Sequence, residues 1–589
     1  MFLLTVTLYN CIVSSNSNKC VRAWSHALAA TGLSAAREAA GADSGMAEGP
    51  TAAEVFLSAL LEFPTLERPK KIIFSLCFIV ARAAAKRILS FSICCFFEAD
   101  TFTKIELEKN MAENLDSVYK CISSERYTPY SLARKIGAVA ILESASFAKG
   151  RERYSILMAE EAFKIIQDDD GVAFLIDGKR VPFVSAEDSL DALGRKKPAD
   201  ILDALLYVAG QHKNFENSAD IPVPASGMGY LSYEFARRCD NIRFFEQEDE
   251  LGVPESLFIA GHIYIVFDHF TETMHIFGFN YNEHKIDINA AVEKMVKRIN
   301  DMDFSYVEND IGKFEYKILT DLEKSKRKYT QKVVELKKHI VDGDIIQAVP
   351  SRRVQIECKA TALQVYGKLR KVNPSPYMFY LDFGDFQLTG ASPESLVRVR
   401  DGKASIHPIA GTIHRGKSEA EDEELSRTLR ENPKERAEHL MLVDLARNDL
   451  GRVCKSGSVT VPQYMECERY SHVIHLVSNT EGLVKDGVKP IQVLRASFPA
   501  GTVSGAPKIS AMQILSGLEK TKRRFYAGAV GYIQNNGDLD FCITIRSALC
   551  KNGVFSLQAG GGIVYDSTPE REFTETQEKL GALIATLTE

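Results

Sequence analysis

The feature that most constrains the fold is a set of tight-turn sequences. Each pairs glycine with asparagine or aspartate and separates two alternating or apolar runs. They are Gly384-Asp385, Asp401-Gly402, Asn536-Gly537 and Asn552-Gly553. These residue types adopt the positive φ angles that short hairpin turns need, so each pair predicts a β-hairpin. Repeated hairpins predict large antiparallel sheets, and we expect helices on the outside, an α+β architecture.

Hydrophobic periodicity indicates individual elements between these turns. Val172 to Ile176 and Ile263 to Phe267 are short apolar runs typical of strands. Tyr329 to Val341 has apolar residues at helical spacing, and the pattern stops at Gly343. The apolar positions of that helix are Val333, Val334, Leu336 and Ile340. The charged stretch from Asp310 to Lys328 predicts a boundary or a long exposed crossing, so we divide the chain into residues 111–310 and 311–589.

Residues 1–110 differ from the rest and are predicted to be a poorly structured extension. Their two apolar runs, Ile72 to Ala81 and Ile88 to Phe97, are each about 10 residues long, whereas a membrane helix needs roughly 20. The first 37 residues contain no acidic residue, which resembles a transit peptide and would suit a plastid. The alternative that we favour is an over-long reading frame with Met111 as the working start.

Composition excludes several classes of function. The formal net charge of -6 is spread along the chain with no long basic run, so neither nucleic acid nor a membrane is expected as a partner. The 12 cysteines show no paired C-x-x-C spacing. Reduced thiols in a cytoplasmic protein are the better interpretation, and a cysteine nucleophile is not expected.

Two predicted helices carry paired carboxylates. Asn432-Pro433 can cap and start a helix in which Glu435 and Glu438 share one face. In the C-terminal helix, Glu572, Glu575 and Lys579 recur on one face. Carboxylates from two helices could clamp a hard cation such as Mg²⁺. Each pair on its own is more simply interpreted as a solvated helix face.

A third feature indicates an anionic small molecule. Gly560-Gly561-Gly562 follows a run of small-residue strands in which Arg546 is embedded. Consecutive glycines let backbone N–H groups approach an anion, and arginine can grip a carboxylate with two donors. The spacing does not fit a dinucleotide fingerprint. A glycine-rich bulge beside a surface arginine is the structural alternative.

Several longer motifs carry a resemblance to a known family. From about Lys326 to the end, the chain resembles the chorismate-utilising enzymes, in particular anthranilate synthase component I. The resembling segments are Gly343 to Arg353, Asn373 to Phe383, Gly390 to Glu394, Pro408 to Thr412, Glu438 to Gly451, Arg469 to Ser478, Pro499 to Lys508 and Gln558 to Gly562. The resemblance implies the two-subdomain fold of chorismate-binding enzymes, with residues 111–310 as a regulatory portion and residues 311–589 as the catalytic portion.

The resemblance also implies roles for single positions. It implies that Glu438 and Glu575 bind Mg²⁺, with Glu435 and Glu572 as auxiliary carboxylates. The implied chorismate-binding residues are Gly411, Thr412, Tyr526, Arg546, Gly560, Gly562 and Lys579. Glu394 resembles the acid that protonates the departing 4-hydroxyl, His475 resembles the histidine associated with loss of pyruvate, and Thr502 lines the same pocket. Ser144, Pro376, Tyr377 and Met378 resemble the segments that bind tryptophan as a feedback inhibitor.

Two positions discriminate between members of the family. Aminodeoxychorismate synthases commonly have a lysine where this chain has Ala410, and isochorismate and salicylate synthases commonly have one at Gln347. Glutamine cannot act as a general base, so both residues favour ammonia as the nucleophile, and hence an anthranilate synthase large subunit of tryptophan biosynthesis. A separate glutamine amidotransferase subunit would supply the ammonia. Aminodeoxychorismate synthase component I and a catalytically silent tryptophan-binding regulator are the alternatives.

Overall fold

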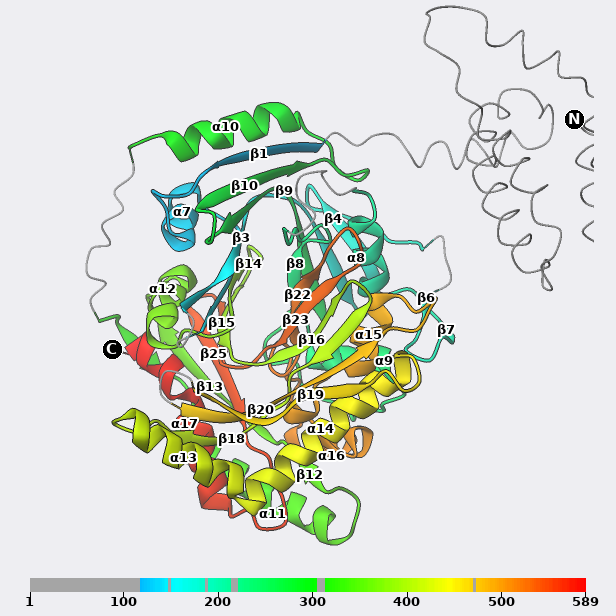
Figure 1. Ribbon diagram of the computed structural model, residues 1–589, viewed down its shortest axis with the longest axis vertical. Coiled ribbons are helices and arrows are strands. Elements are labelled where there is room, and N and C mark those ends of the chain that lie inside the picture. Colours follow the sequence, from blue (N-terminus) through cyan, green and yellow to red (C-terminus); the bar gives the residue numbers. More distant parts are fainter. Residues whose placement is uncertain are drawn as a thin grey trace, which may run out of the picture. The chain divides into compact units, whose positions relative to one another are not determined.

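Antiparallel pairing dominates the computed structural model, which describes residues 117–588 except 147–149, 186–188, 213–220, 304–312 and 470–472. The predicted extension at residues 1–110 lies outside the described residues. Within the described part, 21 strands form one network, and all of its strand pairings are antiparallel (Figure 1). The prediction of large antiparallel sheets with helices on the outside is therefore confirmed.

The strands of the network come from both parts of the chain. Those before residue 310 are β1 (Ser117–Ser123), β2 (Ala140–Ser146), β3 (Gly150–Asp168), β4 (Gly171–Ile176), β5 (Lys179–Pro182), β8 (Met228–Leu231), β9 (Ser256–Asp268) and β10 (Thr273–Phe279). Those after it are β11 (Tyr316–Ile318), β13 (Ser351–Cys358), β14 (Tyr377–Asp382), β15 (Gln387–Ser392), β16 (Ser395–Arg400), β17 (Lys403–Ile406), β18 (Ile409–His414), β19 (Thr460–Arg469), β20 (Val473–Leu483), β22 (Ala529–Ile533), β23 (Leu539–Ile543), β24 (Ser547–Lys551) and β25 (Val554–Gly560). Two further pairs are small ribbons, β6 (Ser189–Leu190) with β7 (Lys196–Lys197) and β12 (Gln347–Ala348) with β21 (Gly505–Ala506).

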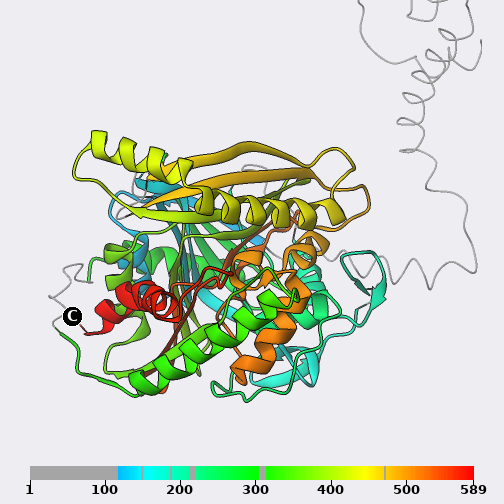
Figure 2. The ribbon, with the colours of Figure 1, turned by 90° about the horizontal axis from the view of Figure 1, so that it is seen from below.

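Helices cover the outer faces of the sheets (Figure 1). They are α7 (Pro129–Ile136), α8 (Ile201–Ala209), α9 (Ala236–Cys239), α10 (Ile288–Asn300), α11 (Leu322–Val341), α12 (Ala362–Val372), α13 (Glu419–Glu431), α14 (Pro433–Val453), α15 (Pro490–Ser497), α16 (Lys508–Glu519) and α17 (Pro569–Thr588), with the 3₁₀ turns η2 (Tyr233–Phe235) and η3 (Gly501–Val503). Figure 2 shows α13 and α14 lying along the strands β18 to β20. In the part of the chain that the structure describes, no helix has the length and apolar character that a membrane crossing would require.

The tight-turn sequences form the expected hairpins. They connect β14 with β15, β16 with β17, β22 with β23, and β24 with β25. Each turn contains a glycine at positive φ, for example +86° at Gly384 and +88° at Gly537, where a side chain would strain the backbone. The predicted strand and helix segments from Val172, Ile263, Tyr329 and Asn432 are also present, as β4, β9, α11 and α14.

The charged stretch from Asp310 to Lys328 is not simply a crossing, and this part of the prediction was wrong. Its described residues include β11 and the start of α11 at Leu322, where the Asp321 side chain caps the Lys324 N–H. The first turns of α11 face solvent, so they carry no apolar periodicity that could reveal a helix. Farther along the same helix, Val334 was assigned to the apolar face but is 48% exposed.

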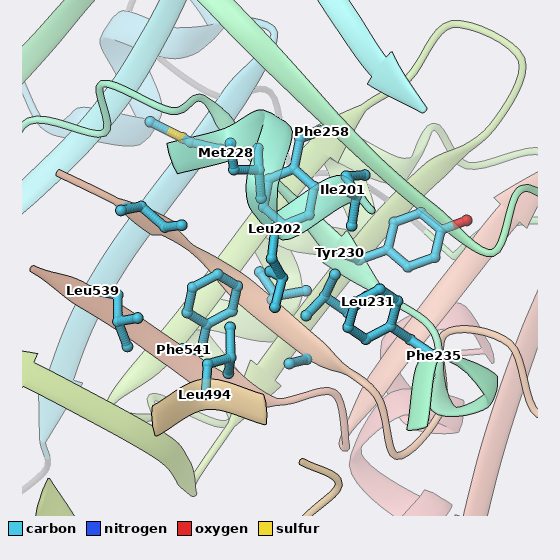
Figure 3. Packing of buried hydrophobic residues seen from close by; sticks show 14 of the residues in the cluster. Ile201, Leu202, Met228, Tyr230, Leu231, Phe235, Phe258, Leu494, Leu539 and Phe541 are labelled. Carbon is cyan, nitrogen blue, oxygen red and sulfur yellow. The ribbon is translucent and has the colours of Figure 1, made fainter. Parts of the chain in front are cut away.

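The sequence of β9 is almost entirely apolar because the strand has a hydrophobic core on each of its two faces. Tyr264 and Val266 contribute to one core, whereas Ile263, Ile265 and Phe267 contribute to the core on the other face of the sheet. Successive side chains of a strand point to opposite faces, so a strand with a core on both sides needs apolar residues throughout. Figure 3 shows part of the first core, to which α8, β8, η2, β9, α15 and β23 contribute. The labelled residues are Ile201, Leu202, Met228, Tyr230, Leu231, Phe235, Phe258, Leu494, Leu539 and Phe541.

Strands from both sides of residue 310 pair directly. β2 pairs with β14 through Glu143 opposite Met378, and β8 pairs with β22 through Leu231 opposite Ala529. The described residues before and after the expected boundary therefore share one hydrogen-bonded network. A buried ion pair adds a further connection, because Arg495 of α15 donates to both Asp200 oxygens, at 2.6 and 2.8 Å, at the start of α8.

We predict that Arg495→Met destabilises the fold strongly. The Arg495 side chain is fully buried, and its removal leaves the buried Asp200 carboxylate without its main partner. Breaking a buried pair in this way costs about 3–5 kcal/mol, which urea unfolding followed by circular dichroism would measure as a shifted midpoint. The control is Arg427→Met, because Arg427 pairs with Glu424 on the surface and is expected to contribute about 1 kcal/mol or less. Equal effects of the two variants would contradict the prediction.

Candidate active site

The three consecutive glycines lie where β25 ends and the chain turns toward α17. A side chain would clash with neighbouring groups at Gly560 and Gly562 and would be crowded at Gly561. A Cβ at Gly560 would be 2.5 Å from the Pro350 carbonyl oxygen and 3.1 Å from the Tyr526 hydroxyl, and a Cβ at Gly562 would be 2.5 Å from Gln347 Nε2. Gly560 and Gly562 therefore bring the backbone close to polar groups of two separate segments, residues 347–350 and Tyr526.

Arg546 lies in the turn between β23 and β24, with a φ of +50°. Its guanidinium makes no hydrogen bond with other residues in the described part of the chain. Burial lowers the pKa of Arg546, and the nearby charges of Tyr526, Glu575 and Glu394 oppose that shift. A partly buried arginine with unused donors is suited to binding an anionic group.

Lys579 is already engaged by protein groups. Its ammonium lies 2.7 Å from Glu575 Oε1 and donates to the Gly560 carbonyl at 3.0 Å. Burial raises the pKa of Glu575, but the Lys579 charge outweighs this effect, so the pKa is lowered overall. Glu575 is therefore held in its ionised form beside the glycine turn.

The four predicted metal-site glutamates face one another from α14 and α17. Burial raises the pKa of Glu438, and the negative charges of Glu435, Glu575 and Glu572 raise it further. Burial also raises the pKa of Glu572, and the Glu575 charge raises it further. The Glu572 Oε2 atom is buried and has no hydrogen-bond partner. Mutual repulsion and an unpartnered carboxylate oxygen fit a site that binds a cation.

The glutamates do not form a closed metal cage by themselves. In the described residues, no group of three or more His, Cys, Asp or Glu side chains is arranged closely enough to hold a metal ion. The four carboxylates are near enough to influence one another's pKa but are not drawn together around a common point. This arrangement resembles the incomplete oxygen shell that Mg²⁺ fills with water and substrate.

Strands β18 and β20 add a histidine and a threonine. Thr412 is opposite His475 in the register, and its hydroxyl lies 3.0 Å from His475 Nδ1, which is also 3.2 Å from the Gly411 carbonyl oxygen. Burial lowers the pKa of His475, so the neutral imidazole is favoured. Gly411 has a φ of +62°, and a Cβ there would lie 3.0 Å from Glu435 Oε2, which places this strand beside the glutamates.

Glu394 lies between β15 and β16 and is 8% exposed. Burial raises its pKa to about 7, although Thr502 and the charges of Lys579 and Arg546 oppose this rise. The Thr502 hydroxyl is buried beside it without a hydrogen bond of good geometry. A cavity opens next to both residues, and Leu442, Ala446 and Asp449 of α14 line its other side. Glu394 is thus a carboxyl that stays protonated close to neutral pH.

The structure brings all the predicted catalytic, substrate and metal residues into one region. The charges of Glu394 and Glu575 influence the pKa of Arg546, so the three side chains are near one another. Gly411 lies against Glu435, and Gly560 lies against the Tyr526 hydroxyl. Tyr329 of α11 also reaches this region, since its hydroxyl is near Gly561, but sequence reasoning missed it. Its spacing with Val333 and Leu336 indicated only a buried helix face.

Of the residues predicted to bind tryptophan, Ser144 lies on β2, Tyr377 and Met378 begin β14, and Pro376 immediately precedes β14. Ser144 follows the register pair of Glu143 with Met378, so it is adjacent to Tyr377. Tyr377 packs against the first core and donates to Asp540 Oδ1 at 3.1 Å. Met378 belongs to the core on the other face, because neighbouring side chains of a strand alternate. Ser144 and Tyr377 can therefore share a ligand more directly than Met378 can.

Comparison with known proteins identifies the relatives of the chain. The chorismate binding enzyme family matches residues 167–585. Anthranilate synthase component 1 of Spirochaeta aurantia is 47% identical over 80% of this chain and 96% of its own length. The protein of the same description from Bacillus subtilis (strain 168) is 35% identical over 82% of this chain and 94% of its own length.

Solved structures agree with these relatives. Anthranilate synthase component I from Streptococcus pneumoniae TIGR4 superposes with a TM-score of 0.62 at 33% identity, covering 73% of this chain and 92% of that one. The menaquinone-specific isochorismate synthase of Escherichia coli has the same fold, with a TM-score of 0.58 at 18% identity, covering 83% of this chain and 100% of that one. The chain belongs to the chorismate-binding enzyme family and, within it, to the anthranilate synthase component 1 group.

Proposed function

We propose that this chain is an anthranilate synthase large subunit that converts chorismate and ammonia into anthranilate, pyruvate and water with Mg²⁺ as cofactor. The observation that carries the proposal is the convergence of a protonated carboxyl, Glu394, with the cationic Arg546 and a cluster of four glutamates. Chorismate is a dianion with a poor leaving group. It needs an anion-binding cation, a metal site and an acid in one pocket.

Two residues favour ammonia over water or lysine as the nucleophile. Ala410 of β18 offers no amine beside Gly411 and Thr412. Gln347 of β12 is buried, and its Oε1 atom has no hydrogen-bond partner in the described part of the chain. An amide oxygen can accept a hydrogen bond from ammonia but cannot remove a proton from water.

The substrate's carboxylates are held by cationic and backbone groups. Arg546 donates to one carboxylate, helped by the Tyr526 hydroxyl and the backbone at Gly560 and Gly562. Thr412 and Gly411 close the opposite side of the pocket. Lys579 remains paired with Glu575 and orients that carboxylate. It contributes to substrate binding only together with Glu575.

Glu394 acts as the general acid. As ammonia adds at C2 of chorismate, the double bond shifts and the C4–O bond breaks, and Glu394 gives its proton to the departing hydroxyl, which leaves as water. Loss of the enolpyruvyl group as pyruvate then makes the ring aromatic. His475, kept neutral by burial and positioned by Thr412 and Gly411, assists this second elimination.

Glu438 and Glu575 would bind Mg²⁺, with Glu435 and Glu572 as auxiliary carboxylates. When bound, the ion would neutralise the ring carboxylate and stabilise negative charge that develops on it. Burial is the main reason why the pKa values of Glu435, Glu438 and Glu572 are raised, and the charges of neighbouring glutamates raise them further, so a bound cation would stabilise the ionised forms.

The proposal includes a partner subunit and a feedback site. The relatives are named component 1, which supports a second component, and a glutamine amidotransferase would supply ammonia. Tryptophan would bind near Ser144 on β2 and near Pro376 and Tyr377 at the start of β14. Since β2 and β14 belong to the same sheet network as the site, tryptophan would favour a conformation less able to close around chorismate.

The full chain is expected to form anthranilate from chorismate, Mg²⁺ and ammonium at alkaline pH, and tryptophan should inhibit the reaction. Anthranilate fluorescence measures the product directly, because neither chorismate nor pyruvate has that emission. A product of chorismate without this fluorescence would contradict the proposal in favour of aminodeoxychorismate synthase. Tryptophan binding by calorimetry without any turnover would favour a silent regulator.

Glu394→Gln is expected to lower kcat by about 10²- to 10⁴-fold while leaving KM for chorismate nearly unchanged, because only proton donation is lost. The pKa of about 7 requires that the acid form disappears as the pH rises through 7. Infrared difference spectra should show a protonated-carboxyl band that titrates near pH 7 and is missing from the variant. Glu357→Gln, at an exposed position of β13, is the control. A Glu394 carboxyl that is ionised at pH 5 would refute this role.

Glu438→Gln and Glu575→Gln are expected to weaken Mg²⁺ binding by more than about 10-fold, as measured by isothermal calorimetry. Glu438→Gln should also stabilise the metal-free protein. Its carboxylate has a raised pKa, so the ionised form is disfavoured by folding and its loss at neutral pH relieves repulsion. Glu578→Gln, on the exposed side of α17, is the matched control. Unchanged Mg²⁺ affinity in both site variants would contradict the metal assignment.

A further inference from the structure

A cavity lies beside the Glu394 carboxyl, between the end of β15 and α14. It measures about 30 Å³ and is partly open to solvent. Glu394 and Thr502 line it on one side, and Leu442, Ala446 and Asp449 of α14 line another. A site needs roughly 10–15 Å³ to hold one water molecule, so this cavity has room for at least one.

The cavity does not include the cations that would hold the substrate. Arg546 and Lys579 are near enough to Glu394 to oppose the rise in its pKa, but neither of them lines the cavity. The Glu394 carboxyl therefore borders two spaces. One is the proposed chorismate pocket on the side of the cations, and the other is the cavity on the side of α14.

Polar groups give the cavity partners for water. The Thr502 hydroxyl lies close enough to Glu394 to oppose part of the rise in its pKa. Asp449 is 5% exposed, and its Oδ2 atom accepts from Lys508 Nζ at 2.9 Å. A cavity lined only by apolar side chains stays dry, whereas two carboxyl groups and a hydroxyl can bind water.

The proposed reaction creates a need for such a space. When Glu394 protonates the 4-hydroxyl, its O–H bond breaks, the C4–O bond breaks with its electron pair on oxygen, and water leaves. Glu394 is then a carboxylate and needs a proton before the next turnover. The ammonia that has added at C2 carries one proton more than the neutral amine, so one proton is released there and one is taken up at Glu394.

We propose that the cavity receives the water that leaves C4 and connects Glu394 to solvent, so that the acid regains its proton by this route. This inference rests on the proposed function of Glu394. The other face of the carboxyl is turned toward the substrate and its cations, so the cavity separates the path of the departing water from the chorismate pocket.

The first test is hydrogen–deuterium exchange of the Glu394 carboxyl in the full chain, followed by infrared spectroscopy without substrate at mildly acidic pH. Ala446→Leu adds bulk to the cavity, and leucine is compatible with the helix. Exchange would then require a transient opening of the packed wall, so the carboxyl band should shift at least about 10-fold more slowly. The band is identified by its absence from Glu394→Gln.

Turnover gives a second measurement. Ala446→Leu should lower kcat and raise its solvent isotope effect, because return of the proton to Glu394 becomes rate-limiting. KM for chorismate and KM for ammonium should stay nearly unchanged, because the cavity takes no part in binding them. A raised KM for ammonium with unchanged exchange would assign the cavity to the entry of ammonia and would overturn the inference.

Two further variants separate filling of the cavity from general damage. Leu445→Phe also fills the cavity, and Leu445 is only half-buried, so a larger ring is more easily accommodated there. Leu442→Ala enlarges the cavity instead. It should lower stability, as loss of a buried side chain does, but exchange should be as fast as in the wild type or faster. Slow exchange in Leu442→Ala as well would indicate general damage and overturn the inference.

Ala420→Leu is the matched control. Ala420 is exposed on α13, so the same substitution adds bulk only at the surface and should leave exchange and kcat unchanged. Exchange at the wild-type rate in both filling variants would overturn the inference and leave the proposed function intact. Absence of any carboxyl band that depends on Glu394 would overturn both the inference and the proposed role of Glu394.

Discussion

Arg523 is the buried cation on which the geometry of the site depends. Its side chain is 1% exposed, and the Glu519 carboxylate accepts from its Nε and Nη2 atoms at 2.7 and 2.8 Å. Its remaining donors reach the Val503 carbonyl at 2.9 Å and the Val349 carbonyl at 2.7 Å. Val503 directly follows Thr502 in the sequence. Val349 directly precedes Pro350, whose carbonyl lies against Gly560. A buried charge is tolerated only when it is fully paired, so the ion pair holds both segments in place.

The same cation connects the N-terminal part of the chain to the site. The Glu234 carboxylate accepts from the backbone N–H groups of Arg523 and Arg524 at 2.7 and 3.1 Å, and the Arg523 guanidinium stacks on the Tyr233 ring at 4.4 Å. Tyr526 follows three residues after Arg523. The residues before 310 therefore supply the anion and the aromatic ring that fix the segment leading to Tyr526.

Sequence patterns predicted most of the elements, and the residues that they single out for the proposed site lie in one region of the structure. The turns at Gly384 and Asn536 and the cap at Asn432 are local signals, and local conformational preferences were enough to identify them. Glu438 and Glu575 were singled out as candidate metal ligands because helical spacing and the family motifs agree. The start of α11 was missed because its exposed first turns carry no periodicity. Tyr329 was missed because its position beside Gly561 depends on how α11 packs against the end of β25, and spacing along one helix contains no information about a neighbouring element.

The sequence by itself determined the antiparallel architecture, the candidate chemistry and the family, because turn preferences, periodicity and motif identity are properties of the chain order. Only the tertiary structure decided how the groups act on one another. Burial makes Glu394 an acid with a pKa of about 7, whereas the Lys579 charge keeps Glu575 ionised, although both are glutamates in the same region. Solvation and the charges of neighbours set a pKa, and both depend on contacts between residues that are far apart in the sequence.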